Sequence, residues 1–490
     1  MDKEYQRLIL ITIDCLRKDC LDKNGEKVIP NITKFSKNAI IFEKAISNGA
    51  STSPAFYSLF TSKIPTSDGP YTPLKPNMDT FVKILKENRI KTCGIHSNPH
   101  LGKNNNYHKG FDYFFDFFRS PPRSSSHKKN IIKKIHQILK FFKINEFILK
   151  IGNRFLRKTK FSSKNKTFEI KNFKSPYSDA KSIVVEAIRW LNKNYNKDFF
   201  LWIHFMDAHR PNYPQDKFIK KISEIEISLR KKKYLHEMGK KIKVNPEIAE
   251  TLDENDKKLI KVLYNAELNY VDHYFGIFVK FLRNLNIYNK IDFILTSDHG
   301  EFLLEHNLLE HTAALYEEVL RIPLILKLNN VKPPRYKIED QVQIIDLAPT
   351  ILDLFNLPID KSFEGKSIIP LIEGAETYQH PKYAICATLH NRHVVYTIYN
   401  KFHARYYLLI ACRSNNWKLI YDDQERRFQF FNLKKDPYEQ KDLAGKKEEE
   451  IVYVKNIFKN VLEPFISQYS SEEVKIKQSI EKNITKLKNI

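Results

Sequence analysis

Two continuous apolar stretches, residues 8–13 (LILITI) and residues 291–295 (IDFIL), dominate the hydrophobic pattern of this chain. Short runs rich in β-branched and aromatic residues predict buried strands. Asp14 follows the first run directly, and Asp298 with His299 follows the second after Thr and Ser. Because parallel strands end at one edge of a sheet, where ligands usually bind, we expect these side chains to meet. The pattern predicts a mostly parallel α/β sheet flanked by helices, although each Asp taken alone could instead cap a helix.

The segment 50–65 (ASTSPAFYSLFTSKIP) predicts a helix that begins at Pro54. Proline favours the first helical position, and Thr52 or Ser53 could provide the N-cap. A hydroxyl at a helix N-terminus lies in a positive local field, which suits a nucleophile that must lose its proton. Considered alone, however, this motif is more typical of an ordinary helix cap.

The order of these three motifs resembles that of the sulfatase family, within the alkaline phosphatase superfamily. Asp14 follows the first strand, Thr52 lies two residues before a proline, and Asp298 and His299 follow the later strand. The similarity runs from about residue 7 to about residue 444. Six further segments match in family order: residues 199–211, 315–325, 345–352, 364–367, 417–421 and 432–437.

The resemblance implies a fold and a domain organisation. It predicts an alkaline-phosphatase-like α/β catalytic domain over residues 1–370 and a smaller C-terminal α+β domain with an antiparallel sheet over residues 371–450. The segment 451–490 mixes charges evenly and is expected to form a helical tail.

The resemblance also implies one site for a divalent metal ion. Asp14, Asp298 and His299 match metal ligands, and Thr52 matches the nucleophile, which also binds the metal. Two carboxylates, an imidazole and a hydroxyl form a hard, oxygen-rich site, so Mn²⁺, Mg²⁺, Zn²⁺ and Ca²⁺ all remain open. Cys15 matches a second ligand position at which Asp is usual; it could favour a softer ion, but we expect a small buried hydrophobe there.

The catalytic residues implied by the resemblance are Thr52, His209 and His311, and the two histidines are expected to contact charged substrate oxygens or protonate the leaving group. True sulfatases carry Cys, less often Ser, at the position of Thr52 and convert it to formylglycine within a motif that ends in Arg. Phe56 occupies that Arg position, and the flanking cysteines are as far away as Cys20 and Cys93. We therefore expect no formylglycine.

Threonine nucleophiles occur in relatives that cleave or transfer phosphoesters, and an Asp-His pair also favours phosphorus chemistry. We therefore predict a metal-dependent hydrolase or transferase that acts on phosphoesters, either diesters or monoesters, through a covalent Thr52 intermediate. One alternative is a sulfuric ester hydrolase that acts on a sulfated glycan or a small molecule. A second alternative is a non-catalytic basic module that binds an anionic polymer or a membrane.

The composition is that of a globular enzyme, because 490 residues with 42% hydrophobic content can bury a large core and a smaller one. No apolar run reaches the roughly 18–20 residues of a membrane span, and the charged N-terminal residues do not resemble a signal peptide. Five cysteines at irregular spacing indicate free thiols, so we expect a cytoplasmic protein.

The net charge of +25 is concentrated between residues 119 and 174, which hold 17 Lys or Arg against two acids. Apolar residues at helical spacing in this segment predict a basic amphipathic helix, within an insertion over residues 119–175. It could contact an anionic membrane surface, bind a polyanion or cover the active site. We expect an anionic phosphoester or sulfate-ester substrate, either free or linked to a glycan or a lipid, and no specific nucleic acid partner. A second basic cluster, residues 230–233, is expected to be a solvated helix face.

Overall fold

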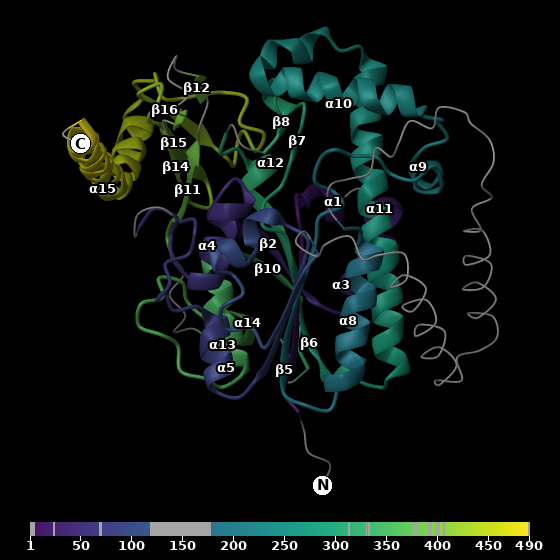
Figure 1. The fold of residues 1–490 in the computed structure, drawn as a ribbon. Coiled ribbons are helices and arrows are strands. Elements are labelled where there is room, and N and C mark those ends of the chain that lie inside the picture. The colour runs from purple at the N-terminus through teal and green to yellow at the C-terminus, as the bar shows by residue number, and fades with distance from the viewer. Residues whose placement is uncertain are drawn as a thin grey trace. The chain divides into compact units, whose positions relative to one another are not determined.

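The computed structural model of this chain describes residues 5–22, 25–67, 71–117, 178–311, 314–329, 331, 334–375, 381–390, 394–396, 402–404 and 407–488. Within these residues the largest sheet has eight strands (Figure 1). In spatial order they are β10 (Lys337–Gln343), β2 (Ile40–Ile46), β9 (Arg321–Lys327), β6 (Asp292–Thr296), β1 (Arg7–Ile13), β5 (Phe199–Phe205), β3 (Lys91–His96) and β4 (Tyr113–Asp116).

The centre of this sheet is parallel, and its register places the predicted site residues at one edge. Strand β1 lies between β6 and β5 and runs parallel to both. Thr12 pairs with Thr296, and Ile13 pairs with Phe205, so the chain leaves all three strands at the same level. Only β9, among the described strands of this sheet, runs antiparallel to its neighbours. The predicted mostly parallel sheet is therefore confirmed, and all seven residues of β1 are buried.

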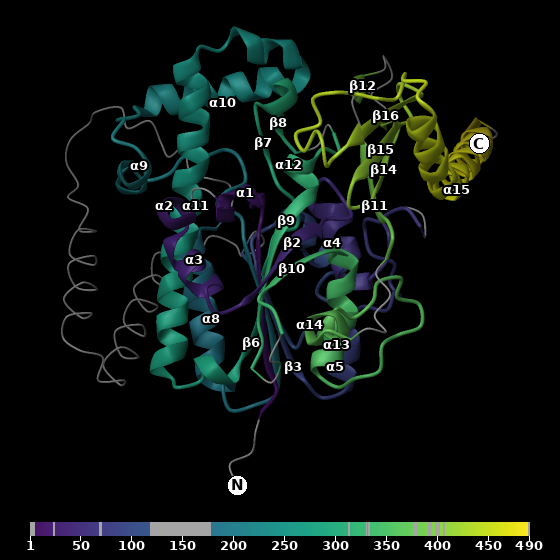
Figure 2. The same ribbon diagram turned by 180° about the vertical axis from the view of Figure 1, so that it is seen from behind.

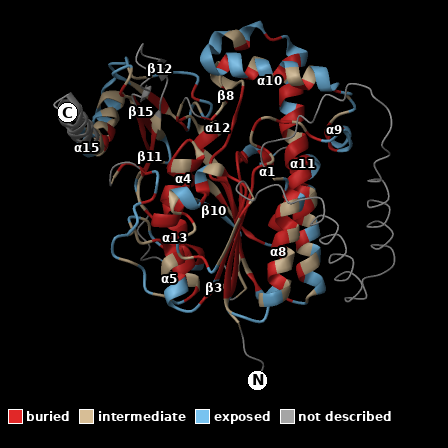
Figure 3. Ribbon diagram, in the orientation of Figure 1, coloured by how far each residue is buried: buried red, intermediate tan, exposed pale blue. Residues whose placement is uncertain are grey.

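Helices cover both faces of the sheet (Figures 1 and 2). One hydrophobic cluster joins the sheet to helices α1 (Asp19–Asp22), α2 (Gly25–Val28), α3 (Pro30–Ser36), α8 (Ala180–Asn194), α9 (Asp216–Ile222), α10 (Leu229–Val244) and α11 (Glu254–Asn284). A second cluster joins the other face to α4 (Thr52–Thr61), α5 (Phe81–Glu87), α13 (Leu347–Leu354) and α14 (Ile369–Glu373). Figure 3 shows the buried strands between helices whose outer faces are exposed.

Short elements complete this part of the chain. The hairpin β7 (Phe302–Leu303) and β8 (Leu309–Glu310) is followed by α12 (Glu317–Leu320). The 3-10 helices are η1 (Pro99–Leu101), η2 (Lys103–Asn105), η3 (Pro246–Thr251), η4 (Tyr288–Lys290), η5 (Glu305–Asn307) and η6 (Ile344–Asp346).

A second, antiparallel sheet follows in the C-terminal part. Its strands, in spatial order, are β11 (Ala384–His390), β14 (Tyr407–Arg413), β15 (Trp417–Asp422) and β16 (Arg427–Asn432), and a separate two-stranded ladder joins β12 (Val394–Tyr396) to β13 (Phe402–Ala404). Helix α15 (Glu449–Lys488) packs on one face through Phe458 and Leu462. The opposite face packs against residues of the first domain, including Ile46 and Phe302. The predicted C-terminal antiparallel sheet is confirmed, whereas the boundaries at 370 and 450 stay predictions.

Two local expectations need correction. Helix α4 begins at Thr52, with Ser51 at the N-cap and no capping side chain, so Thr52 lies within the helix and Pro54 lies two residues further on. The cluster at residues 230–233 lies on α10, but it is not wholly a solvated face, because Lys232 is buried. Its Nζ donates to the Pro214 carbonyl and to Asp216, each at 3.0 Å.

The predicted basic insertion at 119–175 lies outside the described residues, and its contact with membranes stays a prediction. Among the described helices, none combines the length and the apolar character needed to cross a bilayer.

Candidate active site

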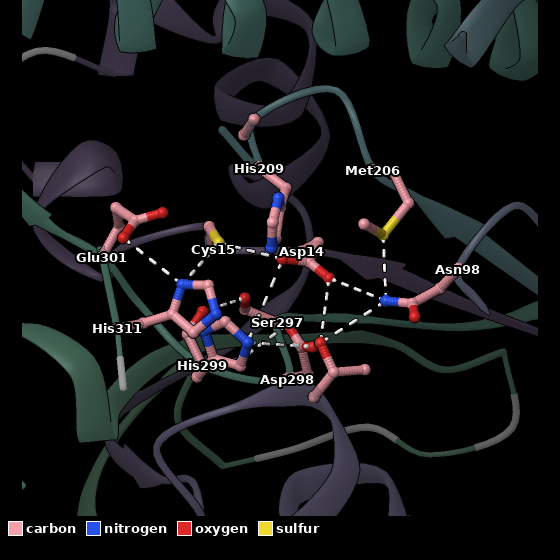
Figure 4. A network of polar contacts seen from close by, with 12 residues as sticks. Asp14, Cys15, Asn98, Met206, His209, Ser297, Asp298, His299, Glu301 and His311 are labelled. Carbon is pink, nitrogen blue, oxygen red and sulfur yellow. Dashed lines mark hydrogen bonds and ion pairs between the residues drawn. The ribbon is translucent and has the colours of Figure 1, made fainter. Parts of the chain in front are cut away.

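Asp14 leaves the end of β1 as a fully buried carboxylate and lies at the centre of the site (Figure 4). The Thr52 hydroxyl and the Asn98 amide each donate to its Oδ2 atom, at 3.3 Å. The neighbouring Cys15 thiol donates to Oδ1 at 2.9 Å. Both oxygens of Asp14 therefore face polar groups, which come from the neighbouring residue, from the start of α4 and from the segment after β3.

Asp298 and His299 lie opposite Asp14, at the end of β6. His299 Nε2 is 3.3 Å from Asp298 Oδ2 and 4.0 Å from Asp14 Oδ1. Ser297 ties the two strand ends together, because its Oγ donates to the Ile13 carbonyl at 2.6 Å. The next residue must be glycine, since a Cβ at Gly300 would lie 2.0 Å from a backbone oxygen of α12.

Thr52 is presented by the first turn of α4 and is almost completely buried. Its helix carries no capping side chain, so the N-terminal amides leave a positive field at this hydroxyl. The preceding loop is held against the Asp298 segment, because Ser47 Oγ donates to the Asp298 carbonyl at 2.5 Å. The sequence predicted the hydroxyl at a helix N-terminus, and the fold places it against Asp14.

His209 and His311 lie side by side next to this cluster. Their ring centroids are 5.2 Å apart, and the His311 ring is 4.2 Å from that of His299. His311 Nδ1 is 3.3 Å from Glu301 Oε1, which fixes the orientation of its ring. The six side chains predicted from the sequence are thus gathered at one edge of the sheet: Asp14, Thr52, His209, Asp298, His299 and His311.

The two carboxylates differ in electrostatic environment. Burial would raise the pKa of Asp14, but a hydrogen bond from His204 and the charges of His209 and His299 hold that pKa well below its ordinary value. Burial and repulsion from Asp14 raise the pKa of Asp298 to about 7. Burial also lowers the pKa of the His299 imidazole. The pocket consequently carries one firmly ionised carboxylate and a second that ionises near neutrality.

Four further residues belong to the site but were not singled out from the sequence. Asn98 Nδ2 donates to Asp14 and also lies 3.4 Å from Thr52 Oγ1. His204 Nε2 lies 3.5 Å from Asp14 Oδ2. Electrostatic effects from Asp14, His209 and His311 act on His100, although burial dominates and lowers its pKa. Glu301 orients His311, as described above. Asn98 and His100 follow the end of β3, and this position after a strand is the sequence feature that could have identified them as site residues.

The donor set suits a divalent cation. Asp14, Asp298 and His299 place one ligand atom each within 4.8 Å of one another. Asp298 Oδ2 and His299 Nε2 are buried and, among the described residues, have no hydrogen-bond partner. An ion would compensate both atoms and the clustered negative charge, so the residues present fit the predicted metal.

Comparison with known proteins shows the family to which this chain belongs. The family model described as Sulfatase matches residues 6–357, and the one described as N-sulphoglucosamine sulphohydrolase, C-terminal, matches residues 305–466. An arylsulfatase of Clostridium perfringens is 25% identical, with 93% of this chain and 94% of that protein covered. Bovine arylsulfatase K is 29% identical over 47% of this chain, and the matched region covers only 43% of that relative.

Solved structures of similar fold include a 2-O GAG sulfatase, with a TM-score of 0.65, 15% identity and coverage of 96% of this chain and 94% of that one. The phosphonate monoester hydrolase of Agrobacterium radiobacter has a TM-score of 0.65, 16% identity and coverage of 95% and 96%.

These relatives favour sulfuric esters over the phosphoesters of our main prediction, and they favour an enzyme over a non-catalytic basic module. The chain belongs to the sulfatase family and is an ester hydrolase of that family.

Proposed function

We propose that this hydrolase cleaves a sulfuric ester and that Thr52, unmodified, is its nucleophile. The observation that carries the proposal is the position of the Thr52 hydroxyl, at the N-terminus of α4 and 3.3 Å from Asp14. The names of the sequence relatives supply the sulfate ester. The 2-O GAG sulfatase of similar fold makes a sulfated glycan the substrate class to examine first.

The side chains present divide the work of such a reaction. Asp14 and Asn98 orient the Thr52 hydroxyl, whose oxygen attacks sulfur while the bond to the leaving oxygen breaks. His209 and His311 lie beside the cluster, where one can protonate the leaving oxygen and the other can stabilise charge on the sulfuryl group. Water then hydrolyses the Thr52 ester.

A divalent ion held by Asp14, Asp298, His299 and the Thr52 hydroxyl would lower the pKa of that hydroxyl and polarise an ester oxygen. Asp298 Oδ2 and His299 Nε2, which make no hydrogen bond among the described residues, support the presence of this ion. We leave Mn²⁺, Mg²⁺, Zn²⁺ and Ca²⁺ as candidates, since carboxylate and imidazole ligands accept all four.

A second candidate is hydrolysis of a phosphoester or a phosphonate monoester at the same site. An unmodified threonine is an alcohol nucleophile of the kind that forms phosphoesters, and a phosphonate monoester hydrolase shares the fold. Both candidates use the same residues, so only a direct substrate comparison separates them.

The test is a comparison of purified, metal-stripped protein reloaded with each of the four ions. Aryl sulfate, a 2-O-sulfated glycan, aryl phosphomonoester and aryl phosphodiester are offered in parallel. Thr52→Ala should lower turnover on the order of 10⁴-fold, because the covalent step is lost. Thr61→Ala is the matched control, since Thr61 is buried at the other end of α4 and donates only to the Tyr57 carbonyl.

The outcomes separate the hypotheses. Sulfate turnover that depends on Thr52 supports the proposal, and dominant phosphoester turnover supports the second candidate. If Thr52→Ala retains wild-type turnover, Thr52 is not the nucleophile. If no substrate is turned over with any ion, sulfuric ester hydrolysis by the isolated protein is contradicted.

A further inference from the structure

A second set of metal-ligating atoms lies directly beside the oxygen-rich site. Cys15, His299 and His311 are all buried, and each places one ligand atom within 4.8 Å of the other two. The Cys15 Sγ atom is 3.6 Å from His311 Nδ1. Figure 4 shows the thiol next to the His311 ring, with the His299 ring on the other side of His311. This set is rich in sulfur and nitrogen, in contrast to the neighbouring set of carboxylates.

The spacing of these atoms matches a tetrahedral zinc site. Zinc binds sulfur at about 2.3 Å and imidazole nitrogen at about 2.0–2.1 Å, so two such ligands are about 3.5 Å apart. The distance between Cys15 Sγ and His311 Nδ1 already has this value without rearrangement. A fourth ligand is at hand, because Glu301 Oε1 lies 3.3 Å from the same His311 nitrogen.

Unpartnered atoms also point to a ligand at this position, although one of them, His299 Nε2, is shared with the oxygen-rich set. His299 Nε2 and Glu301 Oε2 are buried and have no hydrogen-bond partner within the described part of the chain. The exposed fraction of Glu301 is 1% and that of His299 is 0%, so solvent does not compensate either group. A cation bound between the thiol and the two rings would satisfy the imidazole and reduce the cost of burying the carboxylate.

His299 is shared by the two sets, and only one of its nitrogens is available. Its Nδ1 atom lies 2.9 Å from the Gly300 carbonyl, to which it donates, so Nε2 alone can bind an ion. One nitrogen binds one ion at a time. The oxygen-rich set with Asp14 and Asp298 therefore competes with the sulfur-containing set for the same imidazole.

We propose that Cys15, His299 and His311 form an overlapping site for a thiophilic divalent ion such as Zn²⁺, in competition with the hydrolytic metal site. Binding releases the thiol proton to solvent, requires the His311 proton to lie on Nε2 in place of Nδ1, and forms a metal–sulfur and two metal–nitrogen bonds. An ion in this position withdraws His299 from the hydrolytic metal and His311 from the substrate. The existence of the site is independent of the substrate, whereas the inhibition that follows from it rests on the proposed function.

The first test is spectroscopic and uses the metal-stripped full chain. Cobalt, a visible surrogate for zinc, should give a sulfur-to-cobalt charge-transfer band in the near ultraviolet. Cys15→Ser should abolish the band and weaken zinc binding, measured against a chromophoric chelator, at least about tenfold. Cys93→Ser is the matched control, because Cys93 is also a buried thiol but lies within β3, and it should retain the band.

A measurement without any variant guards against misfolding of Cys15→Ser. X-ray absorption of the zinc-loaded wild-type protein should show one sulfur scatterer at about 2.3 Å. Only nitrogen and oxygen scatterers, or a cobalt spectrum without the sulfur band, would overturn the proposal. These measurements do not require turnover, so they test the zinc site separately from the proposed sulfuric ester hydrolysis.

The competition has its own test once a substrate is known. Zinc added to enzyme loaded with Mn²⁺ or Mg²⁺ should inhibit the wild-type protein, and the inhibition should be at least about tenfold less sensitive to zinc in Cys15→Ser. Equal sensitivity of the two proteins would contradict competition through the thiol.

Discussion

Two buried clusters of charged residues occupy this fold, and they are built in opposite ways. At the active site, the ion-pair partners of Asp14 and Asp298 among the described residues are imidazoles at 3.3–4.0 Å, with no Lys or Arg beside them. The other cluster joins α12 to the C-terminal sheet and pairs two acids with two bases. These residues are Glu317, Arg413, Lys418 and Glu439.

The cluster at α12 gives each acid at least one basic partner. Lys418 Nζ lies 2.6 Å from Glu439 and 3.1 Å from Glu317, and Arg413 binds both oxygens of Glu317. Burial opposes ionisation of Glu317, but Arg413 and Lys418 lower its pKa. Burial raises the pKa of Glu439 to about 7 despite the nearby Lys418.

The comparison shows how a structural cluster of buried charged residues can be distinguished from a catalytic one. A cluster whose acids and bases pair with one another within the chain fixes the position of the elements that carry them and requires no bound ion. A cluster of buried carboxylates that has no Lys or Arg partner among the described residues is complete only with an ion or a substrate. Perturbed pKa values occur in both clusters, so the pKa shift alone does not identify the active site.

The largest expected effect comes from breaking the balanced cluster. Lys418→Met leaves Glu439 buried without its cation and should lower the free energy of unfolding by about 3–5 kcal/mol. Denaturant unfolding measures the change, and Lys434→Met, at an exposed position of the same domain, serves as the control. A Lys418→Met protein as stable as wild type would mean that the cluster does not hold the C-terminal sheet in place.

The opposite response is expected at the active site. In metal-free protein, Asp298→Asn should raise stability, because it removes a buried carboxyl whose pKa is raised to about 7. Such a group favours folding below its unfolded pKa, near 4, and this contribution is lost as the pH rises to about 7. The advantage of the variant should therefore grow by up to about 1.4 kcal/mol per pH unit between these values and then level off.

Thermal unfolding in a chelator at several pH values measures this difference. Added Mn²⁺ or Mg²⁺ should stabilise the wild-type protein more than the variant, since Asp298 is a proposed ligand. A difference between the two proteins that stays constant from pH 4 to pH 7 would show that Asp298 does not carry the raised pKa.

The smallest effect is expected where a pair is not buried at all. Lys37 and Glu26 form an ion pair of 3.2 Å with side chains that are 65% and 81% exposed. Lys37→Gln should change the free energy of unfolding by less than about 1 kcal/mol and should not alter metal binding. A larger loss of stability, measured by the same denaturant unfolding, would mean that burial is not what distinguishes the two clusters from the surface.

The sequence predicted the parts of the site that follow long apolar runs. Asp14 and Asp298 were found because β1 and β6 are dominated by apolar residues and each is followed within two residues by a carboxylate. Asn98 was missed because β3 (KTCGIH) mixes polar residues and a glycine into a short strand, so its end carries no comparable signal. The start of α4 was misplaced by two residues, since Pro54 was taken as the first helical residue although the helix begins at Thr52.

The balanced cluster could not be predicted in this way. Glu317 and Lys418 are 101 positions apart in the chain, and their contact depends on how two sheets pack. Periodicity describes which face of an element is buried, but it does not describe which charged residue meets which partner across an interface.

Asn48 has a consequence for how this protein can be divided. It lies in the loop just before Thr52, where its Nδ2 donates to the Ile385 carbonyl at 2.7 Å and its backbone carbonyl accepts from the Ala387 amide at 2.8 Å. Both partners belong to β11, in the second sheet. The C-terminal region is therefore not an exchangeable module: a gene that stops near residue 370, or a chimera with a foreign second sheet, would lose the anchor that sets the position of Thr52.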